Sequence, residues 1–208
     1  RLGGEPQVLP YAPPKGVGMD LIVLYLSPDG GRLAVQVDDE PGRRPTLVFD
    51  LSDLSGGPGE LPGSLAFHGF SGDGESLLAA RLDGDRVTRL ITFPAEGEGH
   101  SVAPPGSVAE DPPYALAADG KTVAFLSGSG KTRLRRYDME SGSTASGPAV
   151  RLRDEESVEA VTWTGETQVT AHVSRPVKGD RTAVRVLEID IGGGRAAVRD
   201  SYTIGGDV

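Results

Sequence analysis

The chain contains neither cysteine nor asparagine among its 208 residues. Without cysteine it can form no disulfide, no zinc–thiolate site and no thiol nucleophile. No apolar run approaches the ~18–20 residues that a membrane-spanning helix needs. The longest such run, Leu21–Leu26, has six residues. No signal peptide is present, and because the first residue is Arg1 rather than methionine, we expect a leader, an anchor or a further domain upstream.

Positive charge is also scarce. Lysine and arginine number 21 against 30 aspartates and glutamates, which gives a formal net charge of −9. Nucleic acids are bound through basic stripes, and anionic membranes attract basic segments, so this composition argues against a nucleic-acid partner and against direct membrane binding. We therefore expect membrane contact only through a segment that is absent from this chain.

Turn residues are abundant: 30 glycines and 16 prolines are spread between short apolar runs. The stretch Ser27–Val35 (SPDGGRLAV) places an Asp-Gly turn between two such runs, and it recurs along the chain. The further copies are Ser71–Ala80, Ala117–Leu126 and a degenerate Thr162–Ala171. The turn glycines, Gly30, Gly74, Gly120 and Gly165, are spaced by 44, 46 and 45 residues. Such a period, with one tight hairpin in each repeat, is typical of β-propeller blades.

These repeats predict an all-β chain folded as a β-propeller. We expect four recognisable blades, at about residues 21–63, 64–112, 113–157 and 158–208. Each blade would contain antiparallel strands, four where the outer strand forms, and because no segment shows helical periodicity we expect almost no helix. Residues 1–20 are rich in proline and glycine, so we expect a lead-in, or an edge strand at Gln7–Tyr11.

A second sequence motif recurs in three of the repeats. Their third strands end in an apolar–Asp–apolar triplet, at Phe49–Leu51, Tyr137–Met139 and Ile189–Ile191. Together with the SPDGxxLAV turn, these triplets resemble the blades of bacterial TolB-like and WD-repeat-like propellers. The Trp-Asp and Gly-His dipeptides of eukaryotic WD repeats are missing, which favours the TolB-like variety. The resemblance implies a propeller fold and leaves the activity open, because propellers host many unrelated functions.

The repeat number leaves three ways to complete the ring. Four blades can close alone, they can belong to a larger propeller, or two chains can form an eight-bladed ring as a homodimer. An open arc would expose two apolar blade faces, which monomers rarely tolerate.

No group of residues in the sequence predicts catalysis, so we expect no enzyme, no catalytic residue, no cofactor and no metal site. Gly128–Thr132 (GSGKT) resembles the end of a phosphate-binding loop, but Phe125 stands in place of its first glycine and the loop joins two strands. The Asp-Gly turns lack the alternating ligands of a calcium loop, and turn formation accounts for Asp29 and Asp73.

The three histidines, His68, His100 and His172, show no metal-ligand spacing. His68 falls in an inner strand, where we expect it to line the central channel. The sole tryptophan, Trp163, is expected in the core.

Function is expected where the repeats differ, in the loops between second and third strands and away from the Asp-Gly turns. The residues that we expect to form interaction loops are Asp38, Asp39, Glu40, Arg43, Arg44, Asp83, Asp85, Lys131, Arg175, Lys178, Asp180 and Arg181.

We therefore expect a non-catalytic binding or scaffold module with a protein partner. It would form the extracytoplasmic domain of an exported or membrane-anchored bacterial protein. One alternative is the sensor domain of a membrane-anchored regulator such as an anti-sigma factor. Another is a propeller hydrolase of lactonase type with a channel metal, although the apolar inner strands and the lack of asparagine argue against it.

Overall fold

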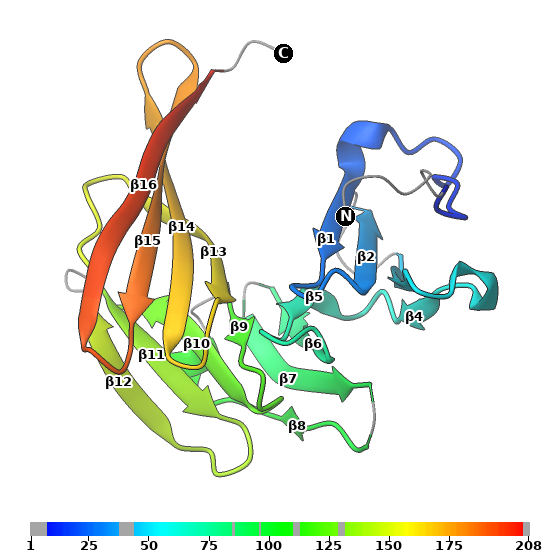
Figure 1. Ribbon diagram of the computed structural model, residues 1–208, viewed down its shortest axis with the longest axis horizontal. Coiled ribbons are helices and arrows are strands. Elements are labelled where there is room, and N and C mark those ends of the chain that lie inside the picture. Colours follow the sequence, from blue (N-terminus) through cyan, green and yellow to red (C-terminus); the bar gives the residue numbers. More distant parts are fainter. Residues whose placement is uncertain are drawn as a thin grey trace.

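The computed structural model of the chain describes residues 8–37, 44–84, 86–95, 97–109, 113–128 and 132–205. Strands in this part of the chain form four antiparallel sheets of four strands each (Figure 1). The sheets follow one another as the blades of a propeller, which confirms the predicted all-β, four-bladed fold. Six predicted interaction residues lie outside the described residues: Asp38, Asp39, Glu40, Arg43, Asp85 and Lys131.

Each blade runs from an inner strand at the centre to an outer strand at the rim. Blade 1 contains β1 (Ile22–Leu26), β2 (Arg32–Val37), β3 (Thr46–Asp50) and β4 (Gly59–Leu61), with 3₁₀ turns η1 (Met19–Leu21) and η2 (Leu54–Gly56). Blade 2 contains β5 (Ala66–Phe70), β6 (Ser76–Asp83), β7 (Arg86–Pro94) and β8 (Ser101–Val102), followed by the short helix α1 (Gly106–Ala109). Blade 3 contains β9 (Ala115–Leu116), β10 (Thr122–Ser127), β11 (Arg133–Asp138) and β12 (Thr144–Ala149). Blade 4 contains β13 (Ser157–Trp163), β14 (Gln168–Val177), β15 (Arg181–Asp190) and β16 (Arg195–Gly205).

The repeated Asp-Gly pair builds the first turn of three blades. Gly30, Gly74 and Gly120 have φ angles of +74°, +82° and +69°, which residues with a Cβ rarely adopt. The aspartate before the glycine caps the turn, as where Asp119 Oδ1 accepts a hydrogen bond from the Thr122 amide at 2.7 Å. A local sequence signal therefore sets the same turn at the same place in successive blades.

Apolar side chains from facing sheets hold neighbouring blades together. Among the described residues they form three separate clusters, one between each pair of successive blades. The clusters between blades 3 and 4 and between blades 2 and 3 contain thirteen and twelve buried residues. The cluster between blades 1 and 2 contains four: Ala34, Leu61, Phe67 and Leu77. Blade 1 is therefore the blade with the smallest buried attachment to its neighbour.

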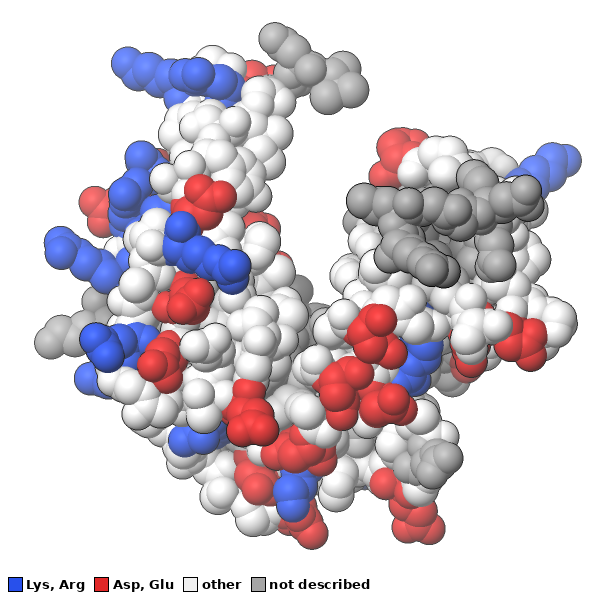
Figure 2. Space-filling model, in the orientation of Figure 1, with Lys and Arg blue, Asp and Glu red and all other residues white. Residues whose placement is uncertain are grey.

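Blades 1 and 4 share no such cluster in the part of the chain that the structure describes. Figure 1 shows β13–β16 and β1–β4 as two arms, and Figure 2 shows open space between them. We call this opening the seam. A closed ring of four blades would have a fourth interface here, so these four blades do not close on themselves.

The lead-in folds back over blade 1 instead of adding a strand to it. Residues 8–11 form no strand, so the edge strand expected at Gln7–Tyr11 is not formed over its described part. The Tyr11 ring meets the Phe49 ring edge-to-face, with centroids 6.5 Å apart. Phe49 and Val35 are buried although neither belongs to the cluster that faces blade 2. The lead-in thus covers the outer part of the blade 1 face that points toward the seam.

Candidate functional site

Two cavities lie where the inner strands of the four blades meet. The larger has a volume of about 770 Å³, and the smaller a volume of about 430 Å³. They share Leu26, Pro28 and Thr162, so they form one continuous depression, which we call the central groove. Leu26 and Pro28 belong to blade 1 and Thr162 to blade 4. The central groove therefore spans the seam.

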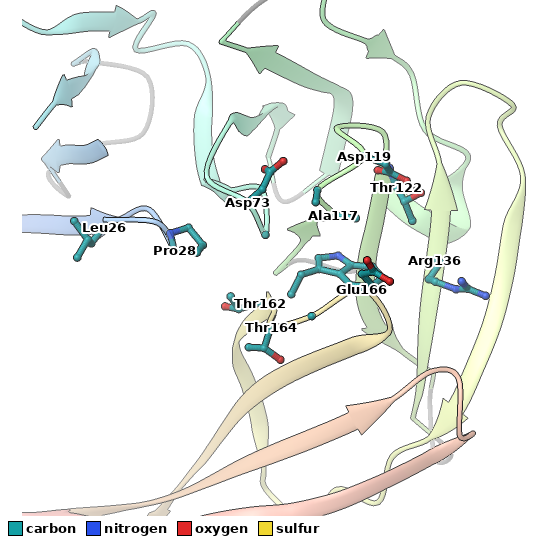
Figure 3. A pocket seen from close by; sticks show the side chains of 14 residues that line it. Leu26, Pro28, Asp73, Ala117, Asp119, Thr122, Arg136, Thr162, Thr164 and Glu166 are labelled. Atoms are coloured by element: carbon teal, nitrogen blue, oxygen red, sulfur yellow. Dashed lines mark hydrogen bonds between the residues drawn. The ribbon is translucent and has the colours of Figure 1, made fainter. Parts of the chain in front are cut away.

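The larger cavity carries an acidic residue from each of three successive blades, beside the first turn of that blade. These residues are Asp73, Asp119 and Glu166, and Figure 3 shows Leu26 across the cavity from Asp119. Asp73 and Asp119 are engaged in their turns, with Asp73 Oδ1 accepting a hydrogen bond from Ser71 Oγ at 2.6 Å. Glu166 makes no hydrogen bond or ion pair with other described residues.

Acidic side chains also gather around the lower end of the seam (Figure 2). Among the described residues that line the larger cavity, Arg136 carries the one positive charge against three carboxylates. The rim of the central groove therefore presents a negative potential, which favours cationic groups on whatever enters it.

Blades 2, 3 and 4 meet at Trp163 in the wall of the larger cavity. The Trp163 indole Nε1 donates a hydrogen bond to the Ala115 carbonyl of blade 3 at 3.1 Å, and its side chain is buried as predicted. The Gly72 amide of blade 2 donates to the Leu116 carbonyl, also at 3.1 Å. A Cβ at Gly72 would lie 3.1 Å from the Trp163 Cβ, so glycine permits this close approach.

The smaller cavity contains His68, which lines the centre of the propeller as predicted. The imidazole meets the Tyr114 ring edge-to-face, with centroids 5.2 Å apart, and its Nε2 is enclosed without a hydrogen-bond partner in the described structure. Burial lowers the pKa of His68 from 6.5 to about 4, so the ring is neutral at pH 7.

The charged residue of the smaller cavity is Glu159. Its Oε1 accepts hydrogen bonds from Ser157 Oγ and Ser174 Oγ, each at 2.6 Å. These two bonds lower the pKa of Glu159 despite the opposing effect of burial, so it remains ionised at neutral pH.

Arg32 ties blades 1 and 2 together beside the groove. Its guanidinium donates a hydrogen bond to the Gly74 carbonyl and lies over the Phe70 ring, 5.5 Å from the centroid. This cross-blade contact adds a polar and cation–π attachment where the apolar cluster is small.

The predicted interaction residues that the structure describes lie on or next to the loops between second and third strands. Asp83 ends β6, Arg44 precedes β3, and Lys178 and Asp180 form the turn between β14 and β15, with Arg175 and Arg181 on the adjoining strands. The contact within this set is local: Arg181 Nε donates to the Lys178 carbonyl at 3.4 Å. Among Asp83, Arg175, Lys178, Asp180 and Arg181, no hydrogen bond or ion pair joins two blades.

The sequence predicts binding at these loops and predicts only a structural role for the Asp-Gly turns. The larger cavity of the central groove nevertheless lies beside the Asp-Gly turns. The sequence signal for it is the repeat itself, because equivalent turns of successive blades converge on the axis of a propeller. Its lining includes Gly72 and Trp163, whose close approach no local pattern reveals.

No cluster of three or more histidine, aspartate or glutamate side chains suited to hold a metal ion occurs among the described residues. In the same residues, no helix is long and apolar enough to span a membrane.

Comparison with solved structures identifies the fold class as a β-propeller of TolB-like arrangement. A protein assigned as TolB from Agrobacterium tumefaciens superimposes with a TM-score of 0.55 at 19% identity, over 85% of this chain and 63% of that one. The β-propeller domain of the Trilobed protease from Pyrococcus furiosus gives 0.49 at 11% identity, over 86% and 58%. A puromycin-hydrolyzing peptidase of Mycobacterium tuberculosis gives 0.47 at 23% identity, over 85% and 28%.

The chain thus spans less than two thirds of the length of each of these structures. No family model matches the sequence, and no curated protein matches it. At these identities the likeness shows the fold, and the activity has to be argued from the groove.

Proposed function

We propose that this propeller is a non-catalytic binding module that takes up a segment of a protein partner in the central groove. The observation that carries the proposal is the groove itself, which is formed by inner strands of all four blades and spans the seam. An extended segment can therefore lie along the groove and contact all four blades.

The lining of the groove suits a protein segment. Leu26, Pro28 and Ala117 offer apolar contacts, while Thr162 and Thr164 offer hydroxyls. Binding pockets commonly combine a mainly apolar lining with a few polar groups that fix orientation. The acidic rim adds a preference for lysine or arginine on the bound segment.

We further propose that the module belongs to an exported or membrane-anchored bacterial protein and acts outside the cytoplasm. The TolB-like arrangement of the blades supports this assignment. Protease accessibility of the tagged chain in intact and permeabilised cells of the source tests it, and complete protection in spheroplasts would contradict it.

Site-specific cross-linking tests the binding proposal. Ala118 is exposed and lines the larger cavity, whereas Ala145 is exposed on β12 at the rim. A photoreactive amino acid in place of Ala118 should cross-link a protein partner in cells, and the same group in place of Ala145 should not.

The affinity of the identified partner then decides whether the groove is its site. Ala118→Trp places a large side chain in the cavity, so it should weaken binding at least tenfold, or by about 1.4 kcal/mol. Ala145→Trp is the matched control and should bind as wild type. Equal binding by all three proteins in calorimetry would refute the groove as the site.

Metal analysis distinguishes the binding module from the alternative, a metal-dependent hydrolase. A stoichiometric divalent ion in the purified chain, lost together with binding on chelation, would contradict a non-catalytic module. We expect the affinity for the partner to be unchanged by a chelator.

A further inference from the structure

The inner strand of blade 1 exposes side chains at positions that are buried in blade 3. Leu24 and Leu26 stand five and three residues before the turn aspartate, and Tyr114 and Leu116 occupy the same positions in blade 3. Tyr114 and Leu116 are each 1% exposed because they pack on blade 2, whereas Leu24 and Leu26 are 58% and 61% exposed. Blade 1 therefore has a face built to pack on a preceding blade, and that face is uncovered at its inner strand.

Large exposed apolar side chains are concentrated on the two end blades. Apart from Leu82 on blade 2, those among the described residues lie in the lead-in, in β1 or in β16: Val8, Met19, Leu24, Leu26, Val198, Tyr202 and Ile204. Val198 pairs with Leu187 and so belongs to the face toward blade 3, whereas Leu24, Leu26, Tyr202 and Ile204 belong to faces that point toward the seam. Exposed apolar area collected in this way marks an interaction surface.

Blade 4 offers the complementary face. Val161, Trp163 and Ala171 point toward blade 3, so the alternate residues of β13 and β14 point toward the seam. Thr162, paired with Thr170 in the sheet, is one of these. On the outer strands Tyr202 pairs with Val184 and Ile204 with Thr182, and these residues continue the same face outward.

One type of contact recurs at all three interfaces within the chain. The face of each blade that points toward the following blade packs on the face of that blade that points back. In the described part of the chain, no blade packs on the inner strand of blade 1 at its seam side, and no blade packs on the side of blade 4 that points toward the seam. The two cannot meet within one chain while the seam is open.

We propose that a second copy of the chain covers these faces, with blade 4 of each copy packed on blade 1 of the other. A two-fold axis makes the two contacts identical and closes an eight-bladed ring. The central groove then becomes part of a channel shared by both copies.

Light scattering on the purified chain gives the first test. The wild type should have twice the mass of the 21.7 kDa chain at micromolar concentration. The double variant Leu24→Glu/Leu26→Glu should be a monomer, and Leu82→Glu is the matched control that should stay dimeric. Circular dichroism and Trp163 fluorescence check that each variant is folded. A wild type that stays monomeric at 100 µM, or a mass that grows without limit, overturns the closed ring.

Disulfide trapping gives the second test, and the natural lack of cysteine makes it clean. One chain carries Leu26→Cys and the other Thr162→Cys, so a disulfide between them can form only across copies. The mixed pair should cross-link rapidly, and a pair of Leu82→Cys with Thr162→Cys should not. Preferential cross-linking of Leu26→Cys to itself would overturn the proposed blade 4 to blade 1 pairing.

Discussion

The His68 imidazole shows how an interblade contact changes the chemistry of one side chain. Its Nε2 is enclosed beside the Tyr114 ring of the next blade, and burial lowers its pKa to about 4. In the unfolded chain the same group has a pKa near 6.5. Between these values the unfolded chain binds a proton that the folded chain does not.

Acid should therefore destabilise the protein through His68. Above about pH 6.5 the free energy of unfolding has its full value with respect to this group. As the pH falls toward 4, protonation of His68 in the unfolded chain lowers that free energy by about 3 kcal/mol in all. Denaturant unfolding at pH 7.5, 5.5 and 4.5 measures this loss. His68→Phe should flatten the pH dependence over this range, while His172→Phe, an exposed site on β14, should leave it as in wild type. Parallel profiles for wild type and His68→Phe would show that His68 is not the group responsible.

A second residue-scale prediction concerns the buried ion pair of Glu156 with Arg185. Arg185 Nε donates to Glu156 Oε1 at 2.7 Å. The side chain of Arg185 is 8% exposed and that of Glu156 is 2% exposed. Burial disfavours the charged form of Glu156, but the hydrogen bonds from Arg185 and from the Arg153 amide, together with the charges of these two arginines, outweigh it and lower the Glu156 pKa.

Removing one partner of such a pair leaves the other charge buried and unpaired. Glu156→Ala should cost about 3 kcal/mol of unfolding free energy or more. The double variant Glu156→Ala/Arg185→Met should recover part of that loss, and chemical denaturation of the three proteins measures both effects. Equal losses in the single and double variants would mean that the unpaired guanidinium is not the cause.

At the scale of elements, the close approach of blades 2, 3 and 4 depends on the absence of a side chain at Gly72. A Cβ there would lie 3.1 Å from the Trp163 Cβ. Gly72→Ala should destabilise the protein by about 1–3 kcal/mol, because neither inner strand can move freely. Since Trp163 is the only tryptophan, its emission reports the displacement directly. Gly205→Ala, at a position with no atom within 4 Å, is the control, and an unshifted emission in Gly72→Ala would contradict the tight contact.

The elements themselves were predictable where their signals are local. The Asp-Gly turns follow from side-chain capping by Asp119 and its counterparts and from the positive φ of the next glycine, so the sequence predicts them directly. The burial of Trp163 follows from its place in an apolar inner strand. The enclosure of His68 and the cavity beside Gly72 were not predictable, because each depends on a residue of another blade, Tyr114 or Trp163.

At the scale of the whole molecule, the spacing of the turns predicts the number of blades, but it does not predict how far they turn around the axis. That angle depends on how the faces of neighbouring sheets pack. The cluster between blades 1 and 2 is much smaller than the other two, with four buried residues against twelve and thirteen.

This difference predicts a gradient of local stability. Regions with few buried apolar contacts open at lower free energy than well-packed ones. In native-state hydrogen exchange, β2 should therefore exchange faster than β10, which is packed on both faces. The measurement is best made on the monomeric Leu24→Glu/Leu26→Glu variant, so that a second copy cannot protect blade 1. Uniform protection across the four blades would show that they open as one unit.

The three interblade clusters also bear on how such a chain changes over evolutionary time. When one chain forms a closed ring, duplication or loss of a blade alters the angle at every interface. Here each blade contacts its chain neighbours and the proposed ring closes through a second copy, so a repeat of about 45 residues gained or lost beside the seam leaves the remaining interfaces within the chain in place and changes the contacts between copies. Among descendants of this sequence, blade number should therefore vary together with oligomeric state, while the packing between neighbouring blades is kept.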